Sequence, residues 1–191
     1  MQDFESLMKS LSQPKEPNRI VRADLSHIDV IADMRVAQQV ENWTNILDRD
    51  FAVYAEQYRQ VTVGYLRRRL NHSLFYVLKY VDDEPVAMSA LEEQDELPPI
   101  TVCIDNKRHG WVVSVYTKPE HRGQGYQQAL MKALLQMARE RGFGDVTLTT
   151  NRPDAIHVYE KAGFQHTSDQ YFLKLYGGQP YGVCPRAGIA E

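Results

Sequence analysis

Residues 112–141 constrain the fold of this chain more than any other stretch. They begin with an extended run rich in β-branched side chains, pass through Pro119 and reach a glycine-rich turn, Arg122-Gly123-Gln124-Gly125. Apolar side chains then recur at helical spacing, at Tyr126, Leu130, Ala133, Leu134, Met137 and Ala138. A strand, a glycine turn and a helix in this order gather backbone N–H groups at the positive end of the helix, where missing Cβ atoms let a phosphate come close. The stretch therefore predicts an anion-binding turn.

The glycine turn matches neither of the two best-known phosphate-binding loops. A P-loop continues with Gly-Lys-Ser/Thr, but this chain reads Gly-Tyr-Gln at residues 125–127. A dinucleotide-binding fingerprint needs a third glycine where this chain has Gln128. The turn suits a pyrophosphate but not the handling of a γ-phosphate. The plainer alternative, in which the glycines serve only the turn, stays open at this point.

The composition is that of one globular domain, with 191 residues of which 43% are apolar and 25% charged. We expect the domain to cover residues 18–176, after an extension (1–17) and before a tail (177–191). The net charge of −3 gives no support for a nucleic-acid partner or a membrane surface. Two cysteines far apart and six histidines, none with metal-ligand spacing, predict a cytoplasmic protein without a metal site.

The rest of the chain alternates short strands with amphipathic helices. Strands are expected at 20–22, 74–79, 86–91, 100–104, 145–150 and within 165–175. Helices are expected after the cap Asp24 and over about 51–70 and 154–161, with a loop at 42–50. An aromatic stripe on the second helix is expected to face the core; its members are Phe51, Tyr54, Tyr58, Val61 and Tyr65. One crossover plus hairpins predicts an α/β fold, a three-layer α-β-α arrangement with a central mixed sheet.

Two motifs in a fixed order carry a resemblance to a known family. The first, V-Y-T-K-P-E-H-R-G-Q-G-Y-Q, spans residues 115–127, and the second, A-I-H-V-Y-E-K-A-G-F, spans residues 155–164. Together they resemble the GNAT superfamily of N-acetyltransferases, whose members commonly read V-x-P-x-x-R-G-x-G-x-G/A and then A-x-x-x-Y-E-K-x-G-F. Gln127 stands where the family has glycine or alanine. The family also frequently reads N-x-x-A before the second motif, and Asn151 lies one residue earlier than that asparagine. The resemblance covers roughly residues 19–175.

The resemblance implies a GNAT-like (acyl-CoA N-acyltransferase) fold whose fourth and fifth strands open into a V that holds acetyl-CoA. The fourth strand would pair with the pantetheine amides as a missing strand does, and the glycine turn would donate N–H groups to the pyrophosphate. The cofactor-binding residues that the resemblance implies are Val115, Tyr116, Thr117, Arg122, Gly123, Gln124, Gly125, Tyr126, Gln127 and Asn151.

The resemblance also implies direct attack of a primary amine on the thioester in a ternary complex. Tyr159 would protonate the leaving thiolate, because a tyrosine with a pKa of about 10 is still protonated at neutral pH. Glu92 and Glu93 end the expected third strand and are candidates for the base that deprotonates the amine. Strand side chains alternate, so these two point to opposite faces, and either is alternatively an ordinary surface acid. The Val115 N–H is the simplest donor to the thioester oxygen.

In such folds the first two helices and their link build the acceptor side. The expected acceptor site therefore consists of the acidic segment 92–96 and several residues of the link, namely Trp43, Asn45, Asp48 and Asp50. Carboxylates there favour a cationic partner, a small-molecule or lysine-type amine acceptor, and a homodimer stays open. Two other functions also stay open: a catalytically silent acyl-CoA-binding regulatory or sensor protein of the same fold, and a nucleotide-binding module that uses the glycine turn alone.

Overall fold

The protein is described by a computed structural model that covers residues 17–47, 50–94, 108–150 and 152–167. Its elements are β1 (Asn18–Arg22), η1 (Leu25–His27), α2 (Ile28–Leu47), η2 (Ala52–Tyr54), α3 (Ala55–Arg69), β2 (Leu74–Val81), β3 (Glu84–Glu93), β4 (Arg108–Thr117), η3 (Pro119–His121), α5 (Tyr126–Glu140), β5 (Phe143–Thr147) and α6 (Pro153–Lys161). The expected tail (177–191), nearly all of the expected extension and the strand expected at 100–104 lie outside the described residues. Of the strand expected within 165–175, only residues 165–167 are described, and they are not a strand.

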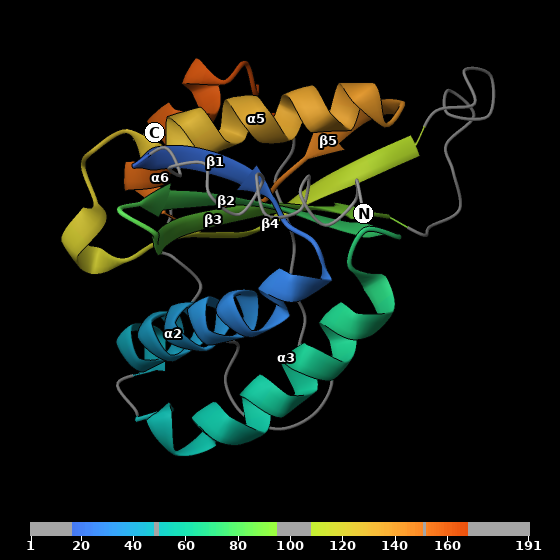
Figure 1. Cartoon of the computed structure of the whole chain (residues 1–191). Helices are drawn as coiled ribbons and strands as arrows, with labels where there is room; N and C mark the ends of the chain where they lie inside the picture. The colour runs from blue at the N-terminus through green and yellow to red at the C-terminus, as the bar shows by residue number, and fades with distance from the viewer. Residues whose placement is uncertain (1–16, 48–49, 95–107, 151, 168–191) are drawn as a thin grey trace, which may run out of the picture.

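The strands form one sheet in the order β1-β2-β3-β4-β5. Neighbouring strands from β1 to β4 run antiparallel, and β5 runs parallel to β4. Figure 1 shows α2 and α3 on one side of the sheet and α5 and α6 on the other. The expected three-layer fold with a mixed central sheet is therefore confirmed.

A two-residue turn joins β2 to β3. Asp82 and Asp83 have φ values of 48° and 65°, and Val81 pairs with Glu84 across them. Positive φ at both central residues gives the mirror-image turn whose twist matches that of the flanking strands. The hairpin expected from the sequence is thus confirmed.

Both faces of β2 and β3 are buried, so the sheet separates two cores. Ile31, Leu66 and Leu78 belong to the core under α2 and α3. Val77 and Leu130 belong to the core under α5. A strand buried on both faces reads as a continuous apolar run rather than an alternating one, as residues 74–78 do.

The ends of α2 and β5 are among the element boundaries that differ from the expected ones. The helix α2 continues to Leu47 through the segment expected as a loop, and the Trp43 indole donates to the Gln39 side chain one turn earlier (2.9 Å). The strand β5 begins at Phe143 and ends at Thr147 rather than covering 145–150. Phe143 starts it early because its ring packs edge-on to Phe75 in the core.

The aromatic stripe on α3 is not the core face, so that prediction was wrong. Val61 is 64% exposed and Tyr54 is 46% exposed, whereas Thr62 and Leu66 are the buried positions of this helix. Tyrosine suits the rim of a core because its ring can pack while its hydroxyl reaches a polar partner. Among the described residues, no helix is long and apolar enough to cross a membrane.

Candidate functional site

The strands β4 and β5 separate after a short parallel pairing. Their ladder runs from Arg108 opposite Phe143 to Trp111 opposite Thr147, and β4 then continues to Thr117 paired with β3 but not with β5. The ladder between β3 and β4 shifts register at the same level, where Ser114 has a φ of 56°. An extra residue of this kind bends a strand and increases its twist, which moves β4 away from β5.

The part of β4 that is not paired with β5 directs main-chain groups away from β3, toward the side where β5 has ended. Lys118 donates its N–H to the Val86 carbonyl (3.0 Å), and Tyr116 lies opposite Met88. Since peptide groups alternate along a strand, the Val115 carbonyl and the peptide groups of Thr117 point away from β3. The pairing of β4 with β5 ends where the opening was expected, and the β4 edge beyond Trp111 can accept an extended ligand as it would a strand.

The glycine turn lies where this edge ends. Gly123 and Gly125 have φ values of 77° and 74°, and no heavy atom beyond their chain neighbours lies within 4 Å of a Cβ built on either. Within the described structure, the N–H groups of residues 123–127 have no backbone acceptor, and the first helical bonds at this end come from Gln128 and Ala129 to the Gly125 carbonyl. A run of unpaired N–H groups at the start of α5 is suited to a phosphate.

Side chains of the same turn bond inside the protein. Arg122 donates through Nε to the Thr117 carbonyl (3.1 Å) and through Nη2 to both carboxylate oxygens of Glu41 on α2 (2.7 Å each). The Tyr126 hydroxyl donates to Gln124 (2.7 Å). The turn therefore has its backbone available for a ligand while its side chains fix its shape.

Gln127, which departs from the family motif, has its side chain turned into the sheet. Its Nε2 donates to the Tyr116 carbonyl (2.7 Å) and to Thr117 Oγ1 (2.9 Å), and its Oε1 accepts from the fully buried Ser89 (2.8 Å). The side chain thus joins the first turn of α5 to β3 and β4, and only its backbone N–H can face a bound anion. Ser89 had no signal in the sequence.

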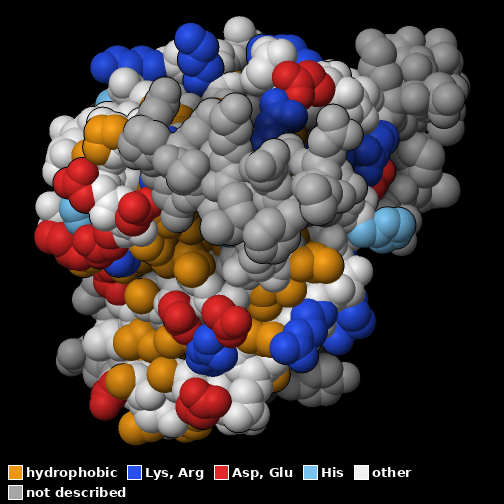
Figure 2. Space-filling view, viewed as in Figure 1, with side chains coloured by type: hydrophobic (Ala, Val, Ile, Leu, Met, Phe, Trp, Pro, Cys, Tyr) orange, Lys and Arg blue, Asp and Glu red, His pale blue; other side chains and the backbone are white. Residues whose placement is uncertain are grey.

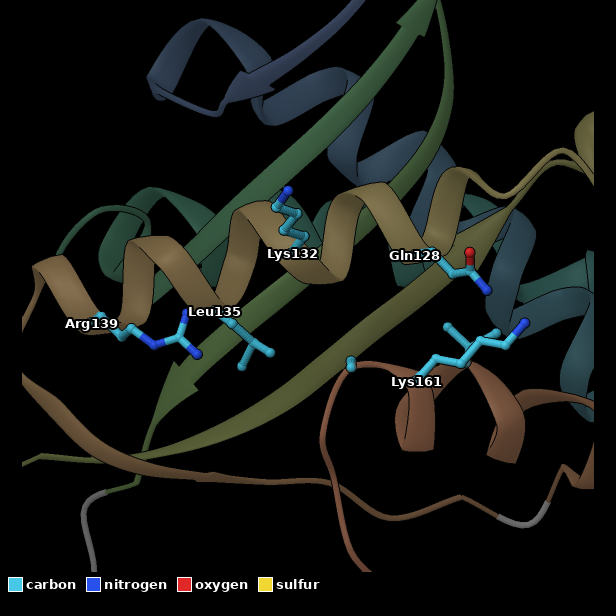
Figure 3. Close-up of a pocket in the computed structure, with 7 residues that line it drawn as sticks. Gln128, Lys132, Leu135, Arg139 and Lys161 are labelled. Atoms are coloured by element: carbon cyan, nitrogen blue, oxygen red, sulfur yellow. The ribbon is translucent and has the colours of Figure 1, made fainter.

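A pocket of about 280 Å³ lies between α5 and α6. Its lining combines apolar and cationic side chains: Gln128, Lys132, Leu135, Arg139, Val158, Lys161 and Ala162. Figure 3 shows Lys161 extending from α6 toward Gln128, at the α5 end that follows the glycine turn. Cations beside an anion-binding turn extend the region that favours negative charge.

Tyr159 lies on α6 and is 9% exposed. Its ring packs edge-on to Phe164 (6.1 Å between centroids) and belongs to the core under α5. Its catalytic role stays a prediction. Asn151 lies outside the described residues.

Glu92 and Glu93 face opposite sides of the sheet, as strand alternation requires. The Glu92 carboxylate accepts from Tyr65 (2.5 Å) and pairs with Arg69, both on α3. Glu93 is held by both arms of the Arg108 guanidinium, and these hydrogen bonds lower the pKa of its carboxyl. A lowered pKa makes Glu93 a weaker base. Since the Glu92 carboxylate is held by Tyr65 and Arg69, the geometry does not favour one glutamate over the other as the general base.

A buried contact that the sequence did not reveal connects α2 to the open edge of β4. Gln38 is 8% exposed; its Nε2 donates to the Val115 carbonyl (2.8 Å) and its Oε1 accepts from Arg35 Nη1 (2.6 Å). Arg35 Nη2 in turn donates to the Tyr58 hydroxyl on α3 (3.1 Å). Periodicity alone could not have found these polar residues, because their partners lie on other elements.

The remaining residues expected near an acceptor are only partly described. Asp50 accepts the Ala52 N–H at the start of η2 (2.8 Å), whereas Asp48 and the Asn45 side chain lie outside the described part. On β4, Ser114 and Tyr116 share the face toward α2, where Ser114 forms a hydrogen bond with the Tyr76 hydroxyl (2.7 Å). Among the described residues, exposed Glu84 and Glu120 with His121 are the one group spaced for a metal, so the expected absence of metal stays untested.

An open strand edge that ends at an anion-binding turn defines a class of α/β proteins that can hold an extended ligand bearing a diphosphate. Comparison with known proteins narrows this class. The model of the "Acetyltransferase (GNAT) family" matches residues 40–164, so the chain belongs to the GNAT acetyltransferase family.

Relatives agree with this assignment over parts of their length. The chain is 30% identical over 118 residues to N-acetyltransferase 8F1 of Rattus norvegicus, covering 61% of this chain and 48% of that protein. It is 43% identical over 58 residues to N-acetyltransferase family 8 member 2 of the same species, covering 29% of this chain and 25% of that protein. The chain thus spans half or less of the length of these curated relatives.

Solved structures share the fold at low sequence identity. A predicted acetyltransferase from Clostridium acetobutylicum, solved with acetyl-CoA, superposes with a TM-score of 0.67 at 23% identity, over 83% of this chain and 96% of that one. A ribosomal-protein-alanine N-acetyltransferase from Brucella melitensis gives a TM-score of 0.60 at 21% identity, over 84% of this chain and 100% of that one. At these identities the comparison supports the fold alone.

Proposed function

We propose that this protein transfers an acetyl group from acetyl-CoA to a primary amine, by direct attack while both substrates are bound. The observation that carries the proposal is the open β4 edge, from Val115 to Thr117, leading into the unpaired N–H groups of residues 123–127. A strand edge suits the amides of a pantetheine arm, and a cluster of N–H groups suits a diphosphate. The neighbour solved with acetyl-CoA has the same fold.

The backbone of the glycine turn would hold the diphosphate of acetyl-CoA. The cations of the α5–α6 pocket would attract the one other phosphate of this coenzyme. Lys132 and Lys161 line that pocket, and neither has an ion-pair partner among the described residues. Acetyl-CoA supplies an acyl group activated as a thioester. Because the main chain makes most of these contacts, side chains of the turn can differ from the family pattern without loss of the site.

Three steps remain for the chain's own groups. The Val115 N–H, at the bulge in β4, would donate to the thioester oxygen as negative charge develops there. The Tyr159 hydroxyl would give its proton to the leaving thiolate. The amine must lose a proton before it attacks, and Glu92 or Glu93 would take it through water, since Arg69 and Arg108 hold both carboxylates.

The proposed acceptor is a small-molecule or lysine-type amine. The proposed location is a reducing, cytoplasmic compartment. A homodimer stays open. A catalytically silent acyl-CoA sensor of the same fold is the alternative. The relatives named as N-acetyltransferases favour the enzyme over the sensor.

Isothermal calorimetry with acetyl-CoA, followed by release of CoA thiol over a panel of amines, tests the proposal. Binding together with amine-dependent release supports the enzyme, binding without release supports the sensor, and no binding refutes both.

Tyr159→Phe tests the proposed acid. We expect turnover to fall about a hundredfold, at the lower end of general acid catalysis, with an unchanged acetyl-CoA Kd. Tyr80→Phe is the matched control, because both tyrosines are 9% exposed and Tyr80 lies on β2. Equal losses of turnover and cofactor affinity in Tyr159→Phe would instead mark a packing residue.

A further inference from the structure

Arg35 differs from every other charged residue of α2. The helix carries three carboxylates, and each pairs with a cation of another element: Asp29 and Asp33 with Arg59, and Glu41 with Arg122. Arg35 is the only Lys or Arg of the helix, and within the described structure it has no carboxylate partner. Each carboxylate of α2 is therefore neutralised, while its one cation has no carboxylate partner among the described residues.

The position of Arg35 makes this imbalance significant. Its guanidinium is half-buried between α2 and α3, and it also acts on the buried Tyr76, whose pKa burial raises and the Arg35 charge lowers. A cation partly removed from water without a counter-ion is unfavourable unless an anion joins it. Two neutral groups, Gln38 Oε1 and the Tyr58 hydroxyl, hold the guanidinium in place and leave other N–H donors for a ligand.

Gln38 also ties Arg35 to the reaction site. The same carboxamide accepts from Arg35 (2.6 Å) and donates to the Val115 carbonyl (2.8 Å), which points into the opening beside β4. An anion bound by Arg35 would therefore lie on the side of the opening where Gln38 meets β4, one side-chain amide away from the Val115 carbonyl.

We infer that Arg35 binds a carboxylate of the acceptor, so that the substrate is an amine with a carboxylate a few bonds away, as in an α-amino acid. A guanidinium forms paired, charge-assisted hydrogen bonds to a carboxylate and fixes its orientation. The carboxylate would anchor the acceptor and leave its amine directed at the thioester. This inference rests on the proposed acetyl transfer. It replaces the purely cationic acceptor that the acidic residues suggested with a zwitterionic one.

The test compares matched acceptors that differ only in the carboxylate. CoA release is measured with the twenty free α-amino acids, the amide of each and the corresponding decarboxylated amines. In the unaltered protein we expect the best amino acid to exceed its own amide in kcat/KM by about tenfold or more, mainly through KM. Arg35→Gln should bring that ratio close to one while the acetyl-CoA Kd is unchanged, and Arg35→Lys should restore part of it.

Arg59→Gln is the matched control, since it also removes an arginine between α3 and α2 and its ion-pair partners in the described part of the chain are Asp29 and Asp33. It should leave the ratio of acid to amide unchanged. If amides and simple amines react as well as amino acids, the inference fails and the acetyl transfer stands. If acetyl-CoA binds and no amine of any kind releases CoA, both fail. A ratio that persists in Arg35→Gln with a native thermal unfolding curve would also overturn the role of Arg35.

Discussion

The glycine turn and the α2 side of the opening would present different parts of the chain to a ligand. At the turn, residues 123–127 present backbone N–H groups, and the side chains of Arg122 and Gln127 bond inside the protein. On the α2 side, side chains act instead, as Gln38 joins Arg35 to the edge of β4. Figure 2 shows apolar, acidic and basic side chains interspersed over one face of the molecule, so charge alone does not mark either region.

This difference explains why the two regions differ in how well sequence predicts them. A backbone site needs a local conformation, which glycines at positive φ give and which a short motif records. A side-chain site needs several elements to meet, and its residues are scattered through the sequence. The turn should therefore be sensitive to backbone changes, and the α2 side to changes in single polar groups.

The largest expected effect is that of Gly125→Val. A β-branched side chain at a φ of 74° is strained, and its Cβ would enter the space left for the phosphate. We expect the acetyl-CoA Kd, measured by calorimetry, to rise at least about a hundredfold. Gly142→Val, at a φ of 79° beyond the other end of α5, should lose stability but keep its cofactor affinity. An equal loss of affinity in both variants would show that the turn matters only for packing.

A smaller effect is expected for Gln127→Leu, which changes a side chain at the start of α5 and leaves the backbone of the turn unaltered. The change leaves the buried Ser89 hydroxyl and the Tyr116 carbonyl without this partner, so we expect the free energy of unfolding to fall by about 2 kcal/mol. Gln136→Leu, at an exposed position of the same helix, should change it by less than about 0.5 kcal/mol. Chemical denaturation measures both. A loss of cofactor affinity as large as that of Gly125→Val would mean that this side chain contacts the ligand.

The smallest effect is expected at Asp24, which starts the helical segment leading into α2. Hydrogen bonds from Ser26 and then His27 lower the pKa of Asp24 from 3.8 to about 2. The folded state therefore gains stability from the ionised carboxylate above pH 3.8 and loses it as the pH falls toward 2. Asp24→Ala should cost about 1 kcal/mol at neutral pH, and the difference from the unaltered protein should shrink below pH 3.8.

Asp24→Asn is the control, since asparagine can still cap a helix and does not titrate. Its unfolding free energy should stay close to that of the unaltered protein at neutral pH. A difference between Asp24→Ala and the unaltered protein that is the same at pH 2 and pH 7 would contradict the assignment of the carboxylate as the cap.

Much of the fold follows from local patterns. The hairpin, the helix after the glycine turn and the glycine ends of α5 and α6 all lie where alternation, helical spacing and positive-φ glycines place them. The errors have a common cause. Helix α2 extends past its expected end, and the tyrosines of α3 lie at the rim of the core rather than within it. In both cases neighbouring elements decide, and a single helix does not record what packs against it.

By itself the sequence determined the three-layer fold, the glycine turn before α5 and the family to which the chain belongs, because each depends on residues close together along the chain. Only the tertiary structure decided that the Gln127 side chain enters the sheet and that Glu92 and Glu93 are held by arginines. Within the residues that the structure describes, it also left Arg35 without a carboxylate partner near the open edge of β4. These results depend on hydrogen bonds between distant segments, and the partner of a polar side chain is fixed only when the chain has folded.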